Sequence, residues 1–376
     1  MPLRVNLRGL DMLRGALAVY VLLGHCRWLL WAGHAQWMAQ AHQPWVELLV
    51  YASAGLRFGH EAVMVFFVLS GFFIHLRAAE LGNPAGAELR TGRFFRRRAH
   101  RLGAPYAFAL LVTLACDLIG RVWFPSLYVA ATGDPLLDNI FGATGYSWRS
   151  VAPALVVLPS SLGQDFGTNG PLWSLAYEVV YYALYPAWFA LRRRSAIVAF
   201  GVLPALSLAV VLVPASPFVT TVVAHYPVWL AGAGLAELLS RHGLPRVTPL
   251  AASASFAAGL ALRMATGSMV LGALAAVLFG AAAVCGFAAI RTAAVPSSIS
   301  RTFEYLGARS YTIYIVHFPF LALLSAWVIE RQGGRPLHGW FAVCGAVAAV
   351  AFGCLCFDVC EKHFVHHRVP AAPPRG

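Results

Sequence analysis

Arg14 and His25 lie eleven residues apart in the first apolar stretch of the chain, LDMLRGALAVYVLLGHCRWLLW (residues 10–31). In a helix this spacing corresponds to roughly 16 Å along the axis and to nearly three whole turns, so both side chains face the same side. An ionisable group near the centre of a membrane helix costs on the order of 2.5–3.5 kcal/mol and usually faces a protein interior or a water-filled cavity. The pair therefore predicts a helix face with a cation near one membrane surface and a proton-transfer group deeper in.

Each member of this pair suits a particular chemistry. The neutral imidazole of His25 can take a proton from a hydroxyl near pH 7. The guanidinium of Arg14 is permanently charged and presents a planar fork of donors that fits phosphate or diphosphate. Two plainer interpretations stay open: His25 as a hydrogen-bonded histidine of the bundle interior, and Arg14 as an anchor that reaches lipid headgroups.

The composition indicates a membrane protein. Of 376 residues 59% are hydrophobic and only 11% are charged, and the mean hydropathy is +0.68, whereas a soluble domain has about 25% charged residues. The basic N-terminus MPLRVNLRG precedes an apolar stretch of full span length without a small-residue cleavage site. We therefore expect a retained first helix rather than a cleavable signal peptide, and no soluble domain.

Hydropathy predicts an all-α, polytopic bundle of about ten transmembrane helices. They are expected near residues 11–31, 58–77, 103–120, 171–191, 195–213, 218–240, 248–265, 267–290, 310–329 and 339–360. The division between 248 and 290 is the hardest to place. Residues 1–362 form the predicted transmembrane domain, and residues 363–376 a short cytoplasmic tail that is partly disordered.

The distribution of basic residues predicts the orientation. With the N-terminus inside, 21 of the 28 Lys and Arg residues fall in the predicted cytoplasmic segments, as the positive-inside rule requires. Both termini are therefore expected in the cytoplasm and the chain in the inner (plasma) membrane. The same distribution accounts for the formal charge of +13 without a nucleic-acid partner.

Two further features limit the interpretation. The seven cysteines lie mostly in apolar runs and show no metal-ligand spacing with histidines, so we expect packing roles, no disulfide framework and no metal site. The longest non-cytoplasmic segment, 121–170, is expected to cap the outer mouth of the bundle. Its apolar run 151–159 is too short to span a membrane.

Four segments carry a family resemblance. They are Arg14 with His25, FFVLSGFFI (66–74), GPLWSLAYEVVYYALYP (170–186) and RSYTIYIVHFPF (309–320). In this order they resemble four signatures of the acyltransferase-3 family of integral membrane acyltransferases: an arginine and a histidine separated by ten residues, Phe-Phe-Val-Ile-Ser-Gly-Tyr, Leu-Trp-Ser-Leu-x-x-Glu, and Ser-Tyr-x-x-Tyr-x-x-His. Order and spacing hold from residue 8 to about 320, so the resemblance covers nearly the whole chain.

The resemblance implies an O-acyltransferase, most often an O-acetyltransferase that acts on sugars of surface or secreted glycans. The donor would be a cytoplasmic acyl-CoA such as acetyl-CoA. Its phosphates would bind Arg14 and the basic loop after the second span, for which we name Arg93, Arg96 and Arg97 together with the neighbouring Arg98 and Arg101. As topology determinants and contacts to anionic lipids, the loop arginines need no ligand.

The third segment places polar groups near the depth of His25. A buried carboxylate costs several kcal/mol unless it is paired or protonated, so Glu178 is predicted to orient His25 or contact the acceptor, with a structural ion pair as the alternative. Trp173 and Ser174, one turn earlier, are expected at the outer mouth as acceptor contacts, although tryptophan is common at membrane interfaces.

The second and fourth segments contribute candidates for the donor side. Gly71 is expected to allow close approach of a helix or ligand, and Ser70 either contacts the donor or bonds back to its own helix. His317 either lines the donor channel or packs in the interior. No role is assigned to four other near-membrane polar groups, His75, Asp117, Glu237 and Asp358.

The sequence thus predicts a membrane O-acyltransferase in which His25 is the base and the partners are lipid, acyl-CoA and a hydroxyl acceptor, with homo-oligomerisation left open. Without a soluble esterase-like domain, the bundle is expected to act unaided or to pass its acyl group to a separate protein. The alternatives are a transporter or flippase for a lipid-linked glycan, since polar groups inside a bundle also mark substrate paths, and a catalytically silent sensor or scaffold.

Overall fold

The computed structural model describes residues 7–32, 38, 44–80, 89–129, 132–142, 144–243, 249–290 and 295–364. Within these residues all regular structure is helical, which confirms the predicted all-α class. A helical segment occupies each of the ten predicted positions: α1 (Leu7–Leu29), α4 (Gly59–Glu80), α5 (Thr91–Trp123), α9 (Trp173–Arg194), η3 (Val198–Val202) continuing into α10 (Leu203–Val210), α11 (Pro217–His242), α12 (Pro249–Ala265), α13 (Met269–Ala289), α14 (Ser297–Gln332) and α15 (Trp340–Val359).

Six helical segments of the described residues are long and apolar enough to cross a membrane: Glu47–Ala79, Thr91–Trp123, Pro217–His242, Met269–Ala289, Ser297–Gln332 and Trp340–His363. The chain is therefore a membrane protein. Helices α1 and α9, with 23 and 22 residues, are also long enough to cross a membrane, but charged and polar side chains interrupt their apolar stretches. Ten crossings and two cytoplasmic termini remain predictions.

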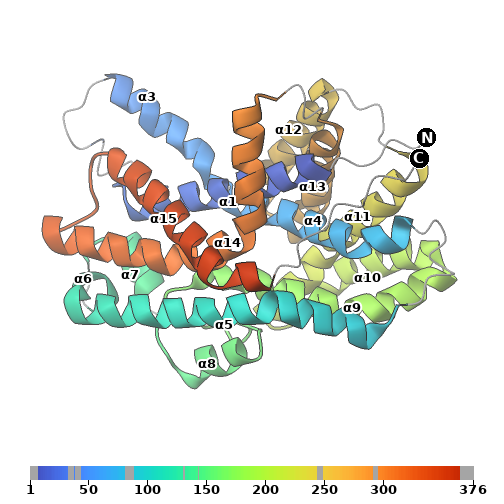
Figure 1. Cartoon of the computed structure of the whole chain (residues 1–376), viewed down its shortest axis with the longest axis horizontal. Helices are drawn as coiled ribbons and strands as arrows, with labels where there is room; N and C mark the ends of the chain where they lie inside the picture. Colours follow the sequence, from blue (N-terminus) through green and yellow to red (C-terminus); the bar gives the residue numbers. More distant parts are fainter. Residues whose placement is uncertain are drawn as a thin grey trace.

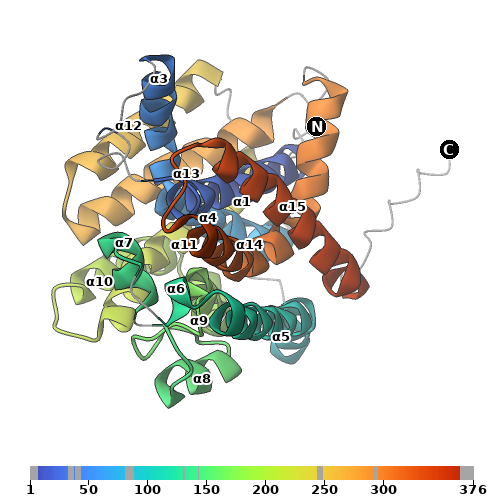
Figure 2. The same ribbon diagram turned by 90° about the vertical axis from the view of Figure 1, so that its left-hand side faces the viewer.

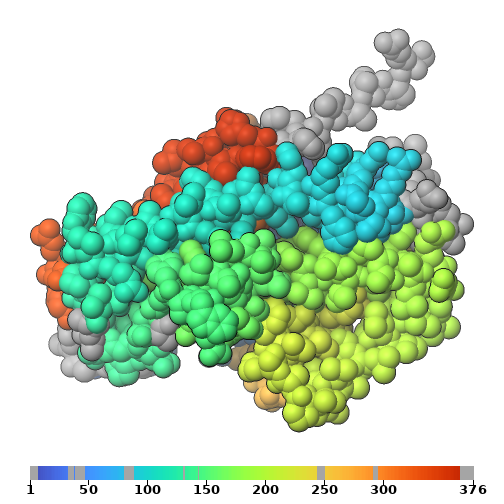
Figure 3. Space-filling model, turned by 90° about the horizontal axis from the view of Figure 1, so that it is seen from below, coloured from blue at the N-terminus to red at the C-terminus, as the bar shows by residue number. Residues whose placement is uncertain are grey.

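Shorter helices lie between the long ones. They are α3 (Pro44–Ser53), η1 (Ala54–Arg57), α6 (Pro125–Tyr128), α7 (Pro135–Phe141), α8 (Trp148–Leu155), η2 (Gly170–Leu172) and η5 (Glu361–His363). In Figure 1, α6 and α7 lie at one end of the molecule, and the beginning of α5 lies at the opposite end. Figure 3 shows α5 as a band along the length of the molecule, with the segment around α8 against its middle.

Several long helices expose large apolar side chains. Examples are Leu111, Leu118 and Val122 on α5 and Val347 and Leu355 on α15. In water such continuous apolar faces would be unfavourable, whereas in a bilayer they contact lipid. The candidate site residues other than the arginines of α5 lie on α1, α4, α9 and α14, of which α1 and α4 are central in Figure 2.

Helices α1 and α14 cross at two glycines. A Cβ atom built at Gly15 would lie 2.3 Å from the carbonyl oxygen of Phe303, and one at Gly307 would lie 2.0 Å from the carbonyl oxygen of Asp11. Because neither residue has a side chain, the two backbones can approach this closely. Farther along, Ser325 Oγ donates a hydrogen bond to the carbonyl of Leu29, so the helices run in parallel.

A second glycine crossing joins α4 to α11. A Cβ atom at Gly71 would lie 1.9 Å from the carbonyl oxygen of Trp229, and one at Gly232 would lie 1.9 Å from that of Val68. The close helix approach predicted for Gly71 is therefore confirmed. It sets the neighbouring Ser70 beside α11 and α9.

A buried polar cluster ties α4, α9 and α11 together near the arginine-rich helix ends. Glu237 accepts hydrogen bonds from Arg192 Nε and Nη2 at 2.8 and 2.5 Å and from His75 Nε2 at 3.0 Å. His75 Nδ1 lies 3.0 Å from the hydroxyl of Tyr185. Every charged member is thus paired, which makes burial of these groups tolerable.

Another buried carboxylate holds the segment before α9. Asp117 of α5 accepts hydrogen bonds from the Tyr146 hydroxyl at 2.7 Å and from the backbone N and Oγ1 of Thr168 at 2.9 and 2.6 Å. The next residue, Asn169, donates from Nδ2 to the carbonyl of Ile315 on α14 at 2.9 Å. Residues 168–173 are thereby fixed between α5 and α14.

Candidate active site

His25 and His317 form a pair inside the bundle. His25 Nδ1 lies 2.7 Å from His317 Nε2, and the rings are stacked with their centroids 5.0 Å apart. Each histidine lies ten residues beyond the glycine at which its helix crosses the other. Because α1 and α14 run in parallel, the same rise of about 15 Å brings both rings to one level.

Hydrogen bonding sets the tautomers of the pair. His317 Nδ1 faces two carbonyl oxygens, that of Tyr314 at 2.7 Å and that of Ile313 at 3.2 Å. Carbonyl oxygens only accept, so Nδ1 carries the proton and the Nε2 of a neutral His317 is an acceptor. His25 then donates from Nδ1, which leaves its Nε2 unprotonated and available as a base.

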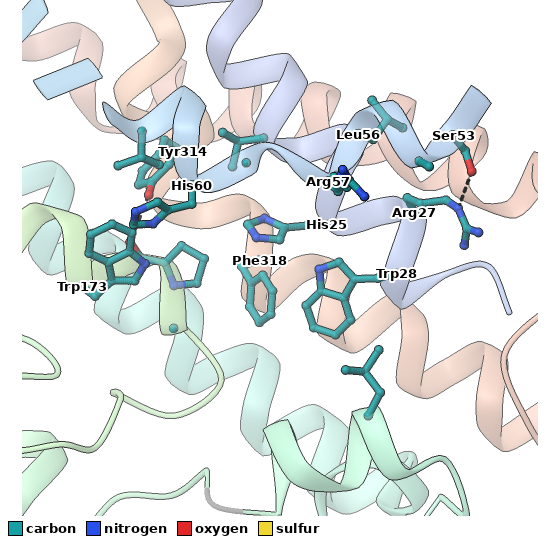
Figure 4. A pocket seen from close by; sticks show the side chains of 18 of the residues that line it. His25, Arg27, Trp28, Ser53, Leu56, Arg57, His60, Trp173, Tyr314 and Phe318 are labelled. Atoms are coloured by element: carbon teal, nitrogen blue, oxygen red, sulfur yellow. Dashed lines mark hydrogen bonds between the residues drawn. The ribbon is translucent and has the colours of Figure 1, made fainter. Parts of the chain in front are cut away.

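His25 opens onto a cavity of about 700 Å³, which we call the histidine cavity. Figure 4 shows His25 in the middle of it, above Phe318, with Trp28 on one side and Trp173 and His60 on the other. The His60 ring stacks on Trp173 with centroids 5.5 Å apart. The cavity thus combines a potential base with flat aromatic surfaces.

The charged residues that line the histidine cavity, among the described residues, are the cations Arg27, Arg57 and Arg335. Arg335 is held by Asp134 through Nε and Nη2 at 2.8 and 2.5 Å. Arg27 donates from Nε to the Ser53 hydroxyl at 2.7 Å. Two of the three arginines are therefore held in fixed positions, and Arg335 is already paired with a carboxylate.

A second cavity of about 600 Å³, the arginine cavity, lies next to the first. Its lining includes four cations, Arg14, Arg77, Arg98 and Arg101. Arg14 is only weakly paired, with Nη1 3.5 Å from Asp11 Oδ1. The Nε of Arg98 is buried and has no hydrogen-bond partner among the described residues. Such a site suits an anion with several oxygen atoms, which would supply the missing acceptors.

Glu178 lies in the arginine cavity together with Ser70. Its Oε1 accepts a hydrogen bond from Ser70 Oγ at 2.5 Å and another from the Tyr182 hydroxyl. Ser70 Oγ in turn accepts from Trp229 Nε1 at 3.2 Å. The structure thus joins the predicted Glu178 and Ser70, whereas the side chain within hydrogen-bond distance of His25 is that of His317.

The basic loop divides into two groups. Arg98 and Arg101 line the arginine cavity, but Arg93, Arg96 and Arg97 are exposed and are not part of its lining. All five lie on α5, so the difference depends on which face of the helix each one occupies. The exposed three are placed to contact solvent or lipid headgroups.

The consecutive residues Trp173 and Ser174 line different cavities. Trp173 faces the histidine cavity and Ser174 the arginine cavity. Two of the described residues line both cavities, Val63 and Tyr314. The Tyr314 hydroxyl lies 2.8 Å from Ser174 Oγ, so the two cavities adjoin at this contact.

Sequence reasoning missed several lining residues: Arg27, Trp28, Arg57, His60, Tyr314 and Arg335. Arg27 and Trp28 lie two and three residues after His25, and Tyr314 belongs to the segment RSYTIYIVHFPF. The first two could have been found by extending the first motif by one helical turn, and Tyr314 by considering every polar residue of the fourth. Arg335 follows α14 far along the chain, and only the tertiary structure brings it to the cavity.

Among the described residues, no group of three or more His, Cys, Asp or Glu side chains is placed to hold a metal ion. The seven cysteines are free thiols.

Comparison with known proteins identifies the family. Residues 7–358 match the acyltransferase-3 family model, described as an acyltransferase domain. The chain is also 28% identical over 139 residues to Acyltransferase MdmB of Streptomyces mycarofaciens, in a match that covers 36% of this chain and 30% of that protein. No solved structure matches. Both cavities lie inside the matched region, and the chain is a membrane protein of the acyltransferase-3 family, whose model is that of an acyltransferase domain.

Proposed function

We propose that the enzyme transfers an acetyl or other short acyl group from cytoplasmic acyl-CoA to a hydroxyl of a sugar in a surface or secreted glycan. The membrane would be the inner (plasma) membrane. The observation that carries this proposal is the His25–His317 pair, which leaves the Nε2 of His25 free to act as a base in a cavity lined by aromatic rings.

The arginine cavity supports an acyl-CoA donor. Arg14, Arg98 and Arg101 offer charge-assisted hydrogen bonds to phosphate and diphosphate oxygens. From Arg14 to His25 the rise along α1 is roughly 16 Å, much of which an extended pantetheine arm can cover. The phosphates would remain among the arginines while the thioester reaches the level of the histidines.

The histidine cavity supports a sugar acceptor. Trp28 and Trp173 provide apolar ring faces, on which the C–H surface of a sugar can pack, and the arginines and His60 provide hydrogen-bond donors. Arg27 and Arg57 also favour an acceptor that carries negative charge, whereas Arg335 is already paired with Asp134.

The proposed reaction is a direct transfer. His25 Nε2 takes the proton of the acceptor hydroxyl as the hydroxyl oxygen bonds to the thioester carbonyl carbon. The carbon–sulfur bond then breaks, and the departing sulfur takes the proton from His25 Nε2. The products are an ester and free coenzyme A, and the imidazole returns to its starting tautomer.

The test is a transfer assay with the purified full-length protein in nanodiscs, labelled acetyl-CoA and an extracted surface glycan. Wild type should release coenzyme A and label the glycan, and His25→Ala should lose on the order of 100-fold or more in rate while still binding coenzyme A. The matched control is His338→Ala, an exposed histidine outside both cavities. An unimpaired His25→Ala variant would refute the proposed base.

The same assay distinguishes the transporter alternative, because a transporter or flippase would move substrate without consuming the thioester. Family membership favours the enzyme.

A further inference from the structure

Tyr314 lies where the two cavities meet. Among the described residues, Tyr314 and Val63 line both cavities. Figure 4 shows its side chain beside His60 and Trp173, at the edge of the histidine cavity. Its ring also contacts the edge of Phe66, with centroids 6.1 Å apart, and Phe66 lines the arginine cavity. The Tyr314 side chain thus separates two spaces of different character.

The tip of this side chain is held by uncharged groups. Its hydroxyl lies 2.8 Å from Ser174 Oγ and 3.2 Å from the carbonyl oxygen of Pro171, which Ser174 Oγ also approaches at 3.1 Å. If the Tyr314 hydroxyl donates to Ser174 Oγ, the Ser174 hydroxyl can donate to the Pro171 carbonyl. If Ser174 donates to Tyr314, the Tyr314 hydroxyl can donate to that carbonyl instead. Neutral hydrogen bonds of this kind contribute little net free energy, so the contact is easily broken and remade.

The proposed reaction requires that this separation open. His25 lines the histidine cavity, whereas Arg14, Arg98 and Arg101 line the other. A thioester whose phosphates are held by those arginines can meet His25 only by passing Val63 and Tyr314. Valine has no comparable freedom to move aside, because its β-branched side chain is short and stiff.

We propose that Tyr314 is a positioning residue that acts as a movable partition between the donor and acceptor cavities. It closes them off from each other while its hydroxyl contacts Ser174, and it admits the pantetheine arm when the side chain swings away. This inference rests on the proposed entry of the donor through the arginine cavity.

The backbone of Tyr314 has a separate task. Its carbonyl oxygen accepts the hydrogen bond from His317 Nδ1 at 2.7 Å, which fixes the tautomer of the histidine pair. Rotation of the tyrosine side chain leaves this carbonyl in place. The partition can therefore open without disturbing the base.

Thiol accessibility tests the partition without relying on activity. In full-length protein whose seven native cysteines are replaced, Ser70→Cys reports on the arginine cavity and Leu56→Cys on the histidine cavity. A charged, membrane-impermeant thiol reagent is applied to right-side-out and to inverted vesicles. With Tyr314 intact, each cysteine should react from one face only, and the two faces should be opposite.

Removing the partition should change this pattern. Tyr314→Ala should make Ser70→Cys reactive from the face that previously reached only Leu56→Cys. Tyr314→Phe and Ser174→Ala, which keep the volume but lose the hydroxyl contact, should raise that reactivity by up to about tenfold. These two milder variants keep the test decisive if Tyr314→Ala does not fold.

Two results would overturn the inference: labelling of Ser70→Cys from both faces with Tyr314 intact, or one-sided labelling that persists in all three variants.

A kinetic experiment provides a second readout. Tyr314→Phe should leave coenzyme A affinity unchanged and raise acceptor-independent hydrolysis of acetyl-CoA, because water reaches the thioester more often; a changed affinity with unchanged hydrolysis would count against the partition. If labelling follows the expected pattern but wild type transfers no acyl group, the partition stands and the proposed function fails.

Discussion

The histidine cavity and the arginine cavity treat charge in different ways. In the arginine cavity four cations share the lining with the carboxylates of Asp11 and Glu178. In the histidine cavity no Asp or Glu is among the described lining residues, and the proposed base, His25, lies within hydrogen-bond distance of a second imidazole, that of His317. Binding a ligand with several negative charges requires arginines whose burial is tolerable before the ligand binds, and nearby carboxylates make it so. Proton transfer instead requires a base that no neighbouring acid has already protonated. Although the two cavities adjoin, Arg14 in one and His25 in the other lie about three helical turns apart on α1.

The largest effect should come from breaking the histidine pair. His317→Leu removes the acceptor for His25 Nδ1–H and frees the ring to adopt the wrong tautomer, so the transfer rate should fall on the order of 100-fold. His317→Gln should retain more activity, because its amide can both accept from His25 and donate to the Tyr314 carbonyl. Steady-state kinetics with acetyl-CoA would measure both.

Coenzyme A affinity should be unchanged in both variants, since the pair lies outside the arginine cavity. Equal transfer rates for His317→Leu, His317→Gln and wild type would show that His317 does not orient the base.

The next largest effect should concern the donor. Replacing Arg98 and Arg101 together by Gln should raise the dissociation constant of coenzyme A about tenfold or more, since a hydrogen bond to a charged group contributes about 1.5–3 kcal/mol. The matched double variant replaces the exposed Arg93 and Arg97 by Gln. It removes the same charge from the same helix and should change affinity by no more than about twofold. Isothermal titration of the protein in nanodiscs would compare them.

Equal weakening by the two double variants would favour the sequence-based assignment of the exposed loop arginines to the donor site.

The smallest effect should be seen on the acceptor side. Asp117→Asn weakens the contacts to Tyr146 and Thr168 that fix residues 168–173, so the free energy of unfolding should fall by about 1–3 kcal/mol. Because Gly170, Pro171 and Trp173 line the histidine cavity, the KM for the glycan should rise while that for acetyl-CoA stays constant. Thermal unfolding and two substrate titrations would test this.

Asp358→Asn on the exposed end of α15 serves as the control. An equal rise in both KM values would mean that Asp117 stabilises the bundle as a whole rather than the acceptor cavity.

The positions of the helices could be predicted well from the sequence, because the length of an apolar stretch and the polarity of the loops around it depend on local composition. It also predicted that Arg14 and His25 share a helix face, since this follows from periodicity alone. It did not predict that His317 rather than Glu178 contacts His25, because that depends on the register between α1 and α14. Nor could it separate Arg98 and Arg101 from their exposed neighbours, since the choice depends on how α5 is rotated about its axis.

The contact between Gly15 and Gly307 fixes α1 and α14 relative to each other, and each histidine of the pair lies ten residues beyond its glycine. Inserting one turn into α1 alone would shift one ring by about 5.4 Å relative to the other, although no residue of either cavity had been exchanged. The same insertion in both helices, between the glycine and the histidine of each, would keep the rings together and move them farther from the arginines. Relatives with insertions of equal length in α1 and α14 are therefore expected to accept longer donors, and relatives with an insertion in one helix alone should be inactive.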